Sequence, residues 1–305
     1  MSLVINHNLM AQNAARNLSE SYSSLGVSTR RLSSGLRVGT AADDAAGLAV
    51  RELMRADISS LNQGVRNAND AISMIQTADG ALGVIDEKLI RMKELATQAS
   101  TGTYTSDQRL IIDSEYQAMA SEITRIANAT DFNGIYLLNG NLSASGGVST
   151  WATGHSGTGL QSTGPLKVHF GTANDSAEDY YYIAIGNSTA SSLGVGNSAA
   201  TTSDGYSIST QASAQKALDA LNKAITSKDN IRANLGALQN RLENTITNLT
   251  VQAENLQAAE SRISDVDVAT EMTNFVRNQI LTQSAVAMLS QANTLPQMAL
   301  QLMQG

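Results

Sequence analysis

The chain has 305 residues, a formal net charge of −7, 15% charged and 4% aromatic residues, and no cysteine. This length suffices for one to three domains, and a composition rich in Ala, Ser, Asn, Gln and Leu favours long helices over a compact aromatic core. The lack of cysteine excludes disulfides, a thiolate nucleophile and Cys-based metal sites, and the lack of a Lys/Arg cluster argues against nucleic acid as a partner.

The N-terminal stretch carries small or apolar residues at alternating spacings of three and four. Asn8 and Thr29 interrupt this ladder. A period of 3.5 predicts a helix with a seam that requires a partner helix. No basic segment precedes an apolar core here, so we expect no cleavable general-secretory signal, and no run of about 18 apolar residues predicts membrane insertion. The ladder comprises Val4, Ala11, Ala15, Leu18, Tyr22, Leu25, Leu32 and Leu36.

Glycines at positions 35, 39 and 47 follow the first predicted helix and indicate a bend before the second. Thr40 is the expected N-cap, with Asp43 and Asp44 in the first turn, where carboxylates favour the helix dipole. The alternative is a cation-binding or acid–base pair, which the divergence of adjacent side chains on a helix disfavours.

A long apolar seam runs from Ile58 to Ala99 and shifts phase between Ile75 and Ala78 by the equivalent of a three-residue insertion. It predicts one continuous helix over residues 44–99. A shorter amphipathic helix is predicted over about 107–128, before a turn at Asp131–Gly134.

The middle of the chain has a different composition. Residues 141–164 and 186–205 are dominated by Gly, Ser and Thr, which predicts loops or flexible linkers. Between them, Lys167–Phe170 and Tyr180–Ile185 have the aromatic and β-branched content of strands, and predict a β-hairpin within about 167–185.

Two further helical patterns complete the chain. Apolar residues from Leu235 to Ile263 predict a helix that packs on the central seam. Pro296 is expected to kink the last helix or to mark its final segment. The terminal ladder comprises Leu281, Ala285, Met288, Ala292, Leu295, Ala299 and Leu302.

The predicted fold is mainly α: a coiled-coil rod of long helices with paired N- and C-terminal helices and a small β-hairpin region in the middle. Five segments are expected, at 1–43, 44–140, 141–205, 206–263 and 264–305.

The inner stripes are interpreted as the core of an intramolecular bundle, whereas the terminal ladders are expected to pack against other subunits, because chain ends fray unless they are docked. His7, His155 and His169 lack the spacing of a metal site, so neither a metal nor a cofactor is expected. The candidate self-assembly residues are Leu18, Tyr22, Leu25, Leu32, Leu281, Ala285, Met288, Leu295 and Leu302.

Three long motifs in this order resemble bacterial flagellin. RRLSSGLRVGTAADDAAGLAVRELMRADI (30–58) is similar to the N-terminal signature of that family, and IANATDFNGIYLLNG (126–140) is similar to the turn that closes its N-terminal half. Residues 254–305 resemble the C-terminal signature over their whole length. Gly39 and Thr40 depart from the more frequent Asn and Ser, and the ending QLMQG departs from the usual tail.

The resemblance implies a secreted, extracellular structural protein of the bacterial flagellum and not an enzyme. Segments 1–43 and 264–305 would pair as coiled coils in the inner tube of the filament, around which the rod domain would form a surrounding tube. The implied partners are many copies of the chain, an export chaperone on the C-terminal segment, and filament cap and junction proteins. Export would use the flagellar type III route in unfolded form.

The resemblance also implies a patch recognised by an animal innate-immunity receptor, with Arg91, Leu95 and Glu115 at the matching positions. Leu95 adjoins the seam and could serve packing instead. Other readings of the chain are a hook–filament junction protein, a secreted adhesin or effector that uses the same export route, and an enzyme inserted in the middle segment.

Overall fold

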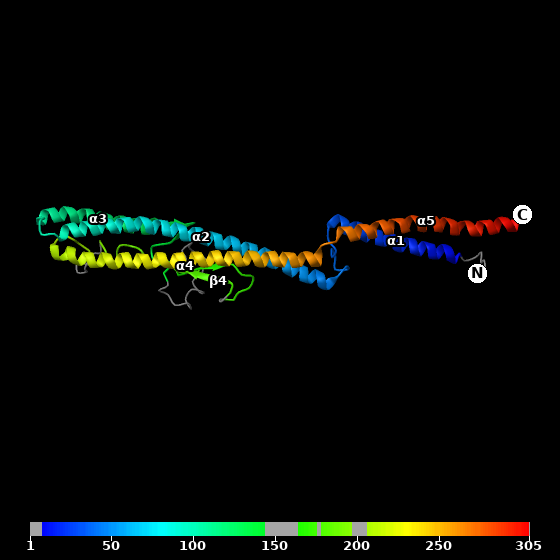
Figure 1. Ribbon diagram of the computed structural model, residues 1–305, viewed down its shortest axis with the longest axis horizontal. Helices are drawn as coiled ribbons and strands as arrows, with labels where there is room; N and C mark the ends of the chain where they lie inside the picture. The colour runs from blue at the N-terminus through cyan, green and yellow to red at the C-terminus, as the bar shows by residue number, and fades with distance from the viewer. Residues whose placement is uncertain (1–7, 144–163, 176–177, 197–205, 305) are drawn as a thin grey trace. The chain divides into compact units, whose positions relative to one another are not determined.

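A computed structural model describes residues 8–143, 164–175, 178–196 and 206–304 of the protein (Figure 1). The packing divides the chain into a terminal unit, Met1–Ile58 with Ala253–Gly305, and a central unit, Ser59–Gln252. The elements are α1 (Leu9–Ser34), α2 (Ala45–Ser100), α3 (Ser106–Ala129), β1 (Asp131–Phe132), β2 (Ile135–Tyr136), β3 (Leu166–His169), β4 (Tyr180–Ile183), α4 (Gln211–Ser264) and α5 (Val268–Gln304).

The mainly α fold with a small β region is confirmed, and so is each predicted helix. The helix expected over 44–99 is α2, and that over about 107–128 is α3. The predicted division at 43/44 lies just before α2 begins, and that at 263/264 lies at the last residue of α4.

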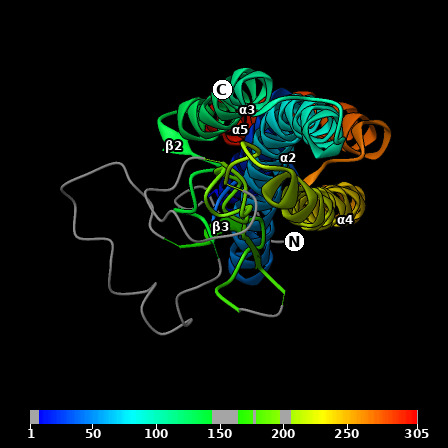
Figure 2. The same ribbon diagram turned by 90° about the vertical axis from the view of Figure 1, so that its left-hand side faces the viewer.

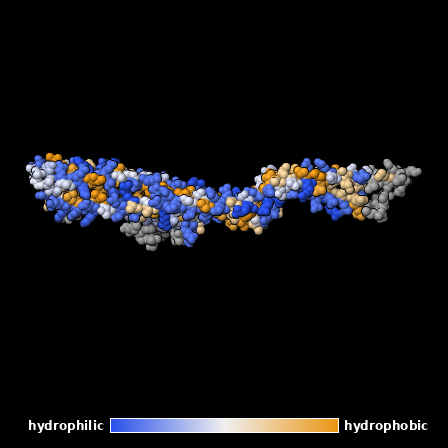
Figure 3. Space-filling model, in the orientation of Figure 1, coloured by the Kyte–Doolittle hydropathy of each residue, from blue (hydrophilic) through white to orange (hydrophobic). Residues whose placement is uncertain are grey.

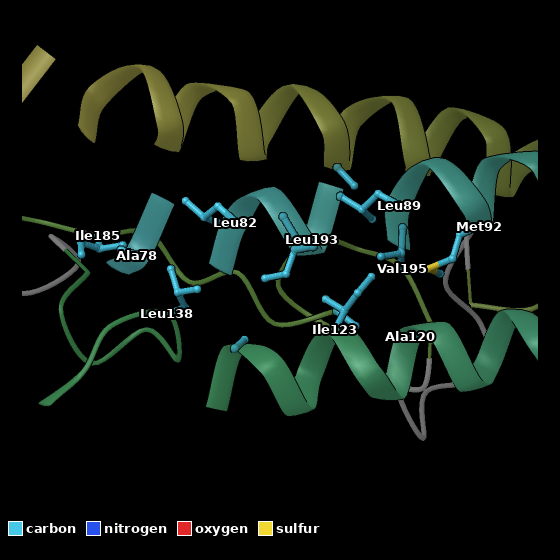
Figure 4. Packing of buried hydrophobic residues seen from close by; sticks show 14 of the residues in the cluster. Ala78, Leu82, Leu89, Met92, Ala120, Ile123, Leu138, Ile185, Leu193 and Val195 are labelled. Carbon is cyan, nitrogen blue, oxygen red and sulfur yellow. The ribbon is translucent and has the colours of Figure 1, made fainter. Parts of the chain in front are cut away.

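The central unit is a three-helix bundle of α2, α3 and α4, whose helices lie side by side in the end-on view of Figure 2. Its core follows the seam of α2: Leu82 and Leu89 are fully buried there. Figure 4 shows Leu82 and Leu89 from α2 facing Ile123 of α3 and Val195 of the chain after β4. The α2 helix runs without interruption through the phase shift at Ile75–Ala78, as expected of a stammer in a coiled coil.

Two antiparallel hairpins lie in the central unit. The turn between β1 and β2 places Asn133 at φ 52° and Gly134 at φ 79°, the left-handed pair that a two-residue hairpin of type I′ requires. The predicted second hairpin is also confirmed: β3 pairs with β4 in the register Val168 with Tyr181.

The chain after β4 is not a flexible linker in its first part. Residues 186–196 form an irregular loop that packs on the bundle, with Leu193 and Val195 buried in the core. Of the two predicted alternatives, a loop or a flexible linker, this part is a loop, and it is ordered because a few apolar residues suffice when the loop lies directly on an existing core. Residues 144–163 and 197–205 of the other predicted loops lie outside the described part of the chain.

In the terminal unit, α1 packs antiparallel along α5. Gly35 ends α1 with φ 72° and donates its N–H to the Arg31 carbonyl. The α1–α2 connection is held to the α4–α5 connection by an isolated bridge between Leu36 and Asp265.

One sequence expectation at the helix ends is corrected. Asp44, not Thr40, caps α2, since its Oδ1 accepts the Gly47 N–H at 3.0 Å. Thr40 instead donates its N–H and hydroxyl to Oδ2 of Asp43 and closes the preceding turn. Helix α5 continues through Pro296 to Gln304, so the segment after this proline is the last part of the helix.

Candidate functional site

The side of α1 that faces α5 consists largely of small residues. Its buried and half-buried positions repeat with the 3.5 period and include Leu18, Leu25 and Leu32 of the predicted ladder. The alternate positions, however, are Ala14, Ser21 and Ser28 and not Ala15 and Tyr22. The ladder was misassigned there because counting apolar residues favoured Tyr22, which the structure exposes. The positions that follow this period are Ala11, Ala14, Leu18, Ser21, Leu25, Ser28 and Leu32, and Val27 and Arg31 beside them are also half-buried.

The inward side of α5 combines small and polar residues with Phe275 and Leu289. Of the terminal ladder singled out in the sequence, Ala285 and Ala292 lie on this side, whereas Leu281 and Met288 are exposed. Helices α1 and α5 contact each other along their length, and their small side chains permit a close approach. The inward positions are Glu271, Phe275, Asn278, Thr282, Ala285, Leu289 and Ala292.

The apolar residues of α5 that face outward form the candidate docking surface. They are spread over most of the circumference of α5 that does not face α1. Four of them recur at every fourth residue from Val268 to Ile280. Figure 3 shows hydrophobic side chains gathered over the start of α5. A helix that is apolar on nearly every side is normally buried, so this surface is suited to another protein chain. Its residues are Val268, Met272, Val276, Ile280, Leu281, Val286, Met288 and Met298.

Helix α1 contributes fewer exposed apolar side chains, namely Leu9, Met10 and Tyr22. The predicted self-assembly residues therefore separate into two groups. Tyr22, Leu281 and Met288 are accessible to another chain, and the rest of the described set is half-buried between α1 and α5. The side chains of Leu295 and Leu302 lie outside the described residues.

Charged residues fasten the turn between α1 and α2. Arg30 Nη2 lies 2.8 Å from Asp43 Oδ1, and Arg31 lies between the carboxylates of Asp43 and Glu271 at 3.9 Å and 3.8 Å. Hydrogen bonds from Thr40, together with the Arg30 charge, hold the pKa of Asp43 below its usual range. The carboxylate thus stays ionised and orders the turn.

The start of α5 is ordered by Asp267. Its side chain accepts the Thr270 hydroxyl at 2.7 Å and the Ala269 N–H at 3.0 Å. These hydrogen bonds lower the pKa of Asp267 from its ordinary value, with the Thr270 hydroxyl as the largest contributor. The sequence analysis did not single out Asp267, although Asp is a preferred residue directly before the first turn of a helix.

The residues of the implied receptor patch lie on α2 and α3 in the central unit. Arg91 Nη2 and Glu115 Oε1 are 2.9 Å apart across the two helices, and both side chains are accessible. Hydrogen bonds to Glu115 and Glu94 raise the pKa of Arg91. Leu95 is only 2% exposed and belongs to the bundle core, so packing is its role in the described chain.

The described residues show no group of three or more His, Asp or Glu that could hold a metal ion. His169 Nδ1 lies 2.8 Å from the Asp179 carbonyl oxygen in the β3–β4 hairpin; His7 and His155 lie outside the described residues. Within the described chain, no helix is both long enough and apolar enough to cross a membrane.

Comparison with known proteins covers both helical ends of the chain. Residues 5–143 match the bacterial flagellin N-terminal helical region, and residues 218–303 match the bacterial flagellin C-terminal helical region. A flagellin of Halalkalibacterium halodurans is 40% identical over 305 residues, which covers 99% of this chain and 100% of that one. The flagellar filament 33 kDa core protein of Treponema phagedenis is 40% identical over 301 residues, with the same coverage.

Among solved structures, a putative flagellar hook-associated protein from Vibrio parahaemolyticus resembles 73% of this chain and 100% of its own, with a TM-score of 0.53. At 14% sequence identity this likeness concerns the fold alone.

Proposed function

Since this chain belongs to the bacterial flagellin family, and is a structural subunit of a flagellar filament and not an enzyme, we propose that its copies polymerise through the outward surface of the α1–α5 pair. Burial of apolar side chains between neighbouring copies would drive assembly. In the filament, the segments 1–43 and 264–305 would form the inner tube, and the central unit would surround it.

The observation that carries this proposal is the distribution of side-chain size on α5. Phe275 and Leu289 face α1 beside alanines, Thr282 and Asn278, while the valines, the methionines, Ile280 and Leu281 are exposed. A helix that served only this intramolecular pair would turn most of its large apolar residues inward, because that arrangement removes the most apolar area from water. The exposure of most large apolar residues of α5 supports a second layer of packing that other copies supply.

Seeded growth of purified protein tests the proposal. Wild-type chain mixed with sheared filament fragments should elongate them, as seen by electron microscopy, while a chain without residues 1–43 and 264–305 should not. Growth of the truncated chain at the wild-type rate would overturn the proposal. A junction or capping protein would instead arrest the seeds, and an adhesin would leave them unchanged.

A point variant localises the surface. Ile280 is 57% exposed, and Ile280→Gln should raise the critical concentration for assembly about tenfold, the equivalent of about 1.4 kcal/mol of lost apolar burial. The matched control is Val84→Gln on α2 of the central unit, also exposed, which should change the critical concentration far less.

We further propose that the chain is exported unfolded by the flagellar type III route, bound beforehand by a chaperone on its C-terminal segment, and assembled outside the cell beneath the filament cap and beyond the junction proteins. The exposed apolar surface of α5 supports the chaperone step, since it would promote aggregation in the cytosol if left uncovered. Deletion of the flagellar export gate should retain the chain inside the cell, and removal of α5 should abolish its complex with the chaperone.

An animal innate-immunity receptor remains a proposed partner. The accessible ion pair of Arg91 and Glu115 supports it, whereas Leu95 would contribute only by supporting the surface around the pair. Receptor-driven reporter cells should respond less to Arg91→Ala than to wild-type monomer, and equally to a control Arg66→Ala on the same helix. An unchanged response to Arg91→Ala would contradict the assignment.

A further inference from the structure

Asn8 links the two terminal helices through one side-chain amide. Its Oδ1 accepts the Ala11 N–H at 3.0 Å and so caps α1, while its Nδ2 donates to the Ala292 carbonyl of α5 at 2.8 Å. The two partners define the orientation of the amide, because exchanging its oxygen and nitrogen would set oxygen against carbonyl and NH₂ against N–H.

The Ala292 carbonyl can accept this bond because of the residue four positions later. In a regular α-helix it would accept the N–H of residue 296, but Pro296 has no N–H. The helix nevertheless continues to Gln304, and Ala292 is 8% exposed. A buried carbonyl without a donor is destabilising, and Asn8 provides the donor that Pro296 lacks.

The alignment of α1 with α5 needs such a contact. Small side chains such as Ala14 on α1 and Ala285 on α5 fit one another in several alignments, so the seam alone specifies the register weakly. At the other end of the pair, the Leu36–Asp265 bridge fixes the alignment through backbone atoms. The Asn8–Ala292 contact agrees with the same antiparallel register near the chain ends.

We propose that Asn8 and Pro296 act together as a register pair, in which Pro296 frees the Ala292 carbonyl and Asn8 binds it. The pair fixes where the outward residues of α1, such as Tyr22, stand relative to those of α5. This consequence for docking rests on the proposed function, whereas the pairing itself does not.

A double-mutant cycle tests the pair. Asn8→Ser keeps an N-cap hydroxyl but is too short to reach Ala292, and Pro296→Ala restores the missing N–H. Asn8→Ser should speed amide exchange in the first turns of α1 and around Ala292 about tenfold, and raise the critical concentration of seeded growth. In the Pro296→Ala background the same substitution should change both quantities less than twofold. The control Asn17→Ser, at an exposed position of α1, should match wild type.

Two results would overturn the register pair: an equal effect of Asn8→Ser in both backgrounds, or no effect in either. Amide hydrogen exchange is measured on filaments and on the soluble chain. If the α1 amides of the wild-type protein were unprotected in both the filament and the soluble chain, that result would also count against the register pair. Failure of wild-type chain to elongate seeds would instead reject the proposed function. If wild-type chain elongates the seeds but the effects of Asn8→Ser and Pro296→Ala are independent, only the register pair is rejected.

Discussion

The ammonium of Lys228 lies 2.6 Å from Asp86 Oδ1, across the interface of α4 and α2, and the lysine side chain is only 2% exposed. A second carboxylate, Asp229, lies 2.8 Å away but is largely exposed. A buried charge requires compensation, so this contact fixes how α4 lies against α2 in the central unit.

The two partners of this ion pair should respond differently to mutation. Asp86→Ala leaves the buried ammonium with only the largely exposed Asp229 as its partner and should lower the free energy of unfolding by about 3 kcal/mol. Lys228→Met removes the charge, fills similar space and leaves a partly hydrated Asp86, so it should cost clearly less. Urea denaturation measures both, with the exposed Lys223→Met as control. A larger loss for Lys228→Met would contradict this account.

Gly64 allows α2 to approach the chain after β3. A Cβ at this position would collide with the Phe170 carbonyl, which is backbone and cannot move aside cheaply. Gly64→Ala should therefore destabilise the central unit by about 1–3 kcal/mol. Gly80 on the same helix has open space around it, and Gly80→Ala should stabilise by about 0.5–1 kcal/mol because alanine favours helix. Thermal denaturation should show a lower melting temperature for Gly64→Ala and a higher one for Gly80→Ala than for wild type.

The sequence predicts a helix interface well where large apolar residues form it, and poorly where small residues do. Large apolar residues such as Leu82 and Leu89 repeat along α2, and each is buried where the 3.5 period places it. The terminal helices follow another rule, since close approach turns Ser28 inward and Tyr22 outward. A search for regularly spaced apolar residues cannot detect an interface that consists of small ones. For the same reason the sequence analysis took Asn8 for an interruption of the ladder, although Asn8 contacts α5.

Acid should loosen the start of α5 through Asp267. Its pKa is lowered in the folded chain, below the ordinary value of about 3.9, so ionised Asp267 favours the folded form. That contribution is complete above about pH 4 and is lost as the pH falls through the folded value. Asp267→Asn keeps a cap acceptor but does not titrate, so its filaments should lose less thermal stability between pH 7 and pH 3 than wild type. The control Asp219→Asn should lose as much as wild type.

Ser28 tests whether close approach is what aligns α1 with α5. It is 4% exposed on the side that faces α5, where a larger side chain would force the helices apart. Ser28→Leu adds apolar area and would be stabilising if burial alone governed the pair, but overpacking should instead cost about 1–3 kcal/mol and lower the temperature at which filaments disassemble. Ser28→Ala preserves the approach and should stay within about 1 kcal/mol of wild type. Ser24→Leu, at an exposed position of α1, separates the effect of position from that of leucine itself. If Ser28→Leu raised the disassembly temperature, the small residues between α1 and α5 would not be there to permit close packing, and the outward placement of the large ones would need another cause.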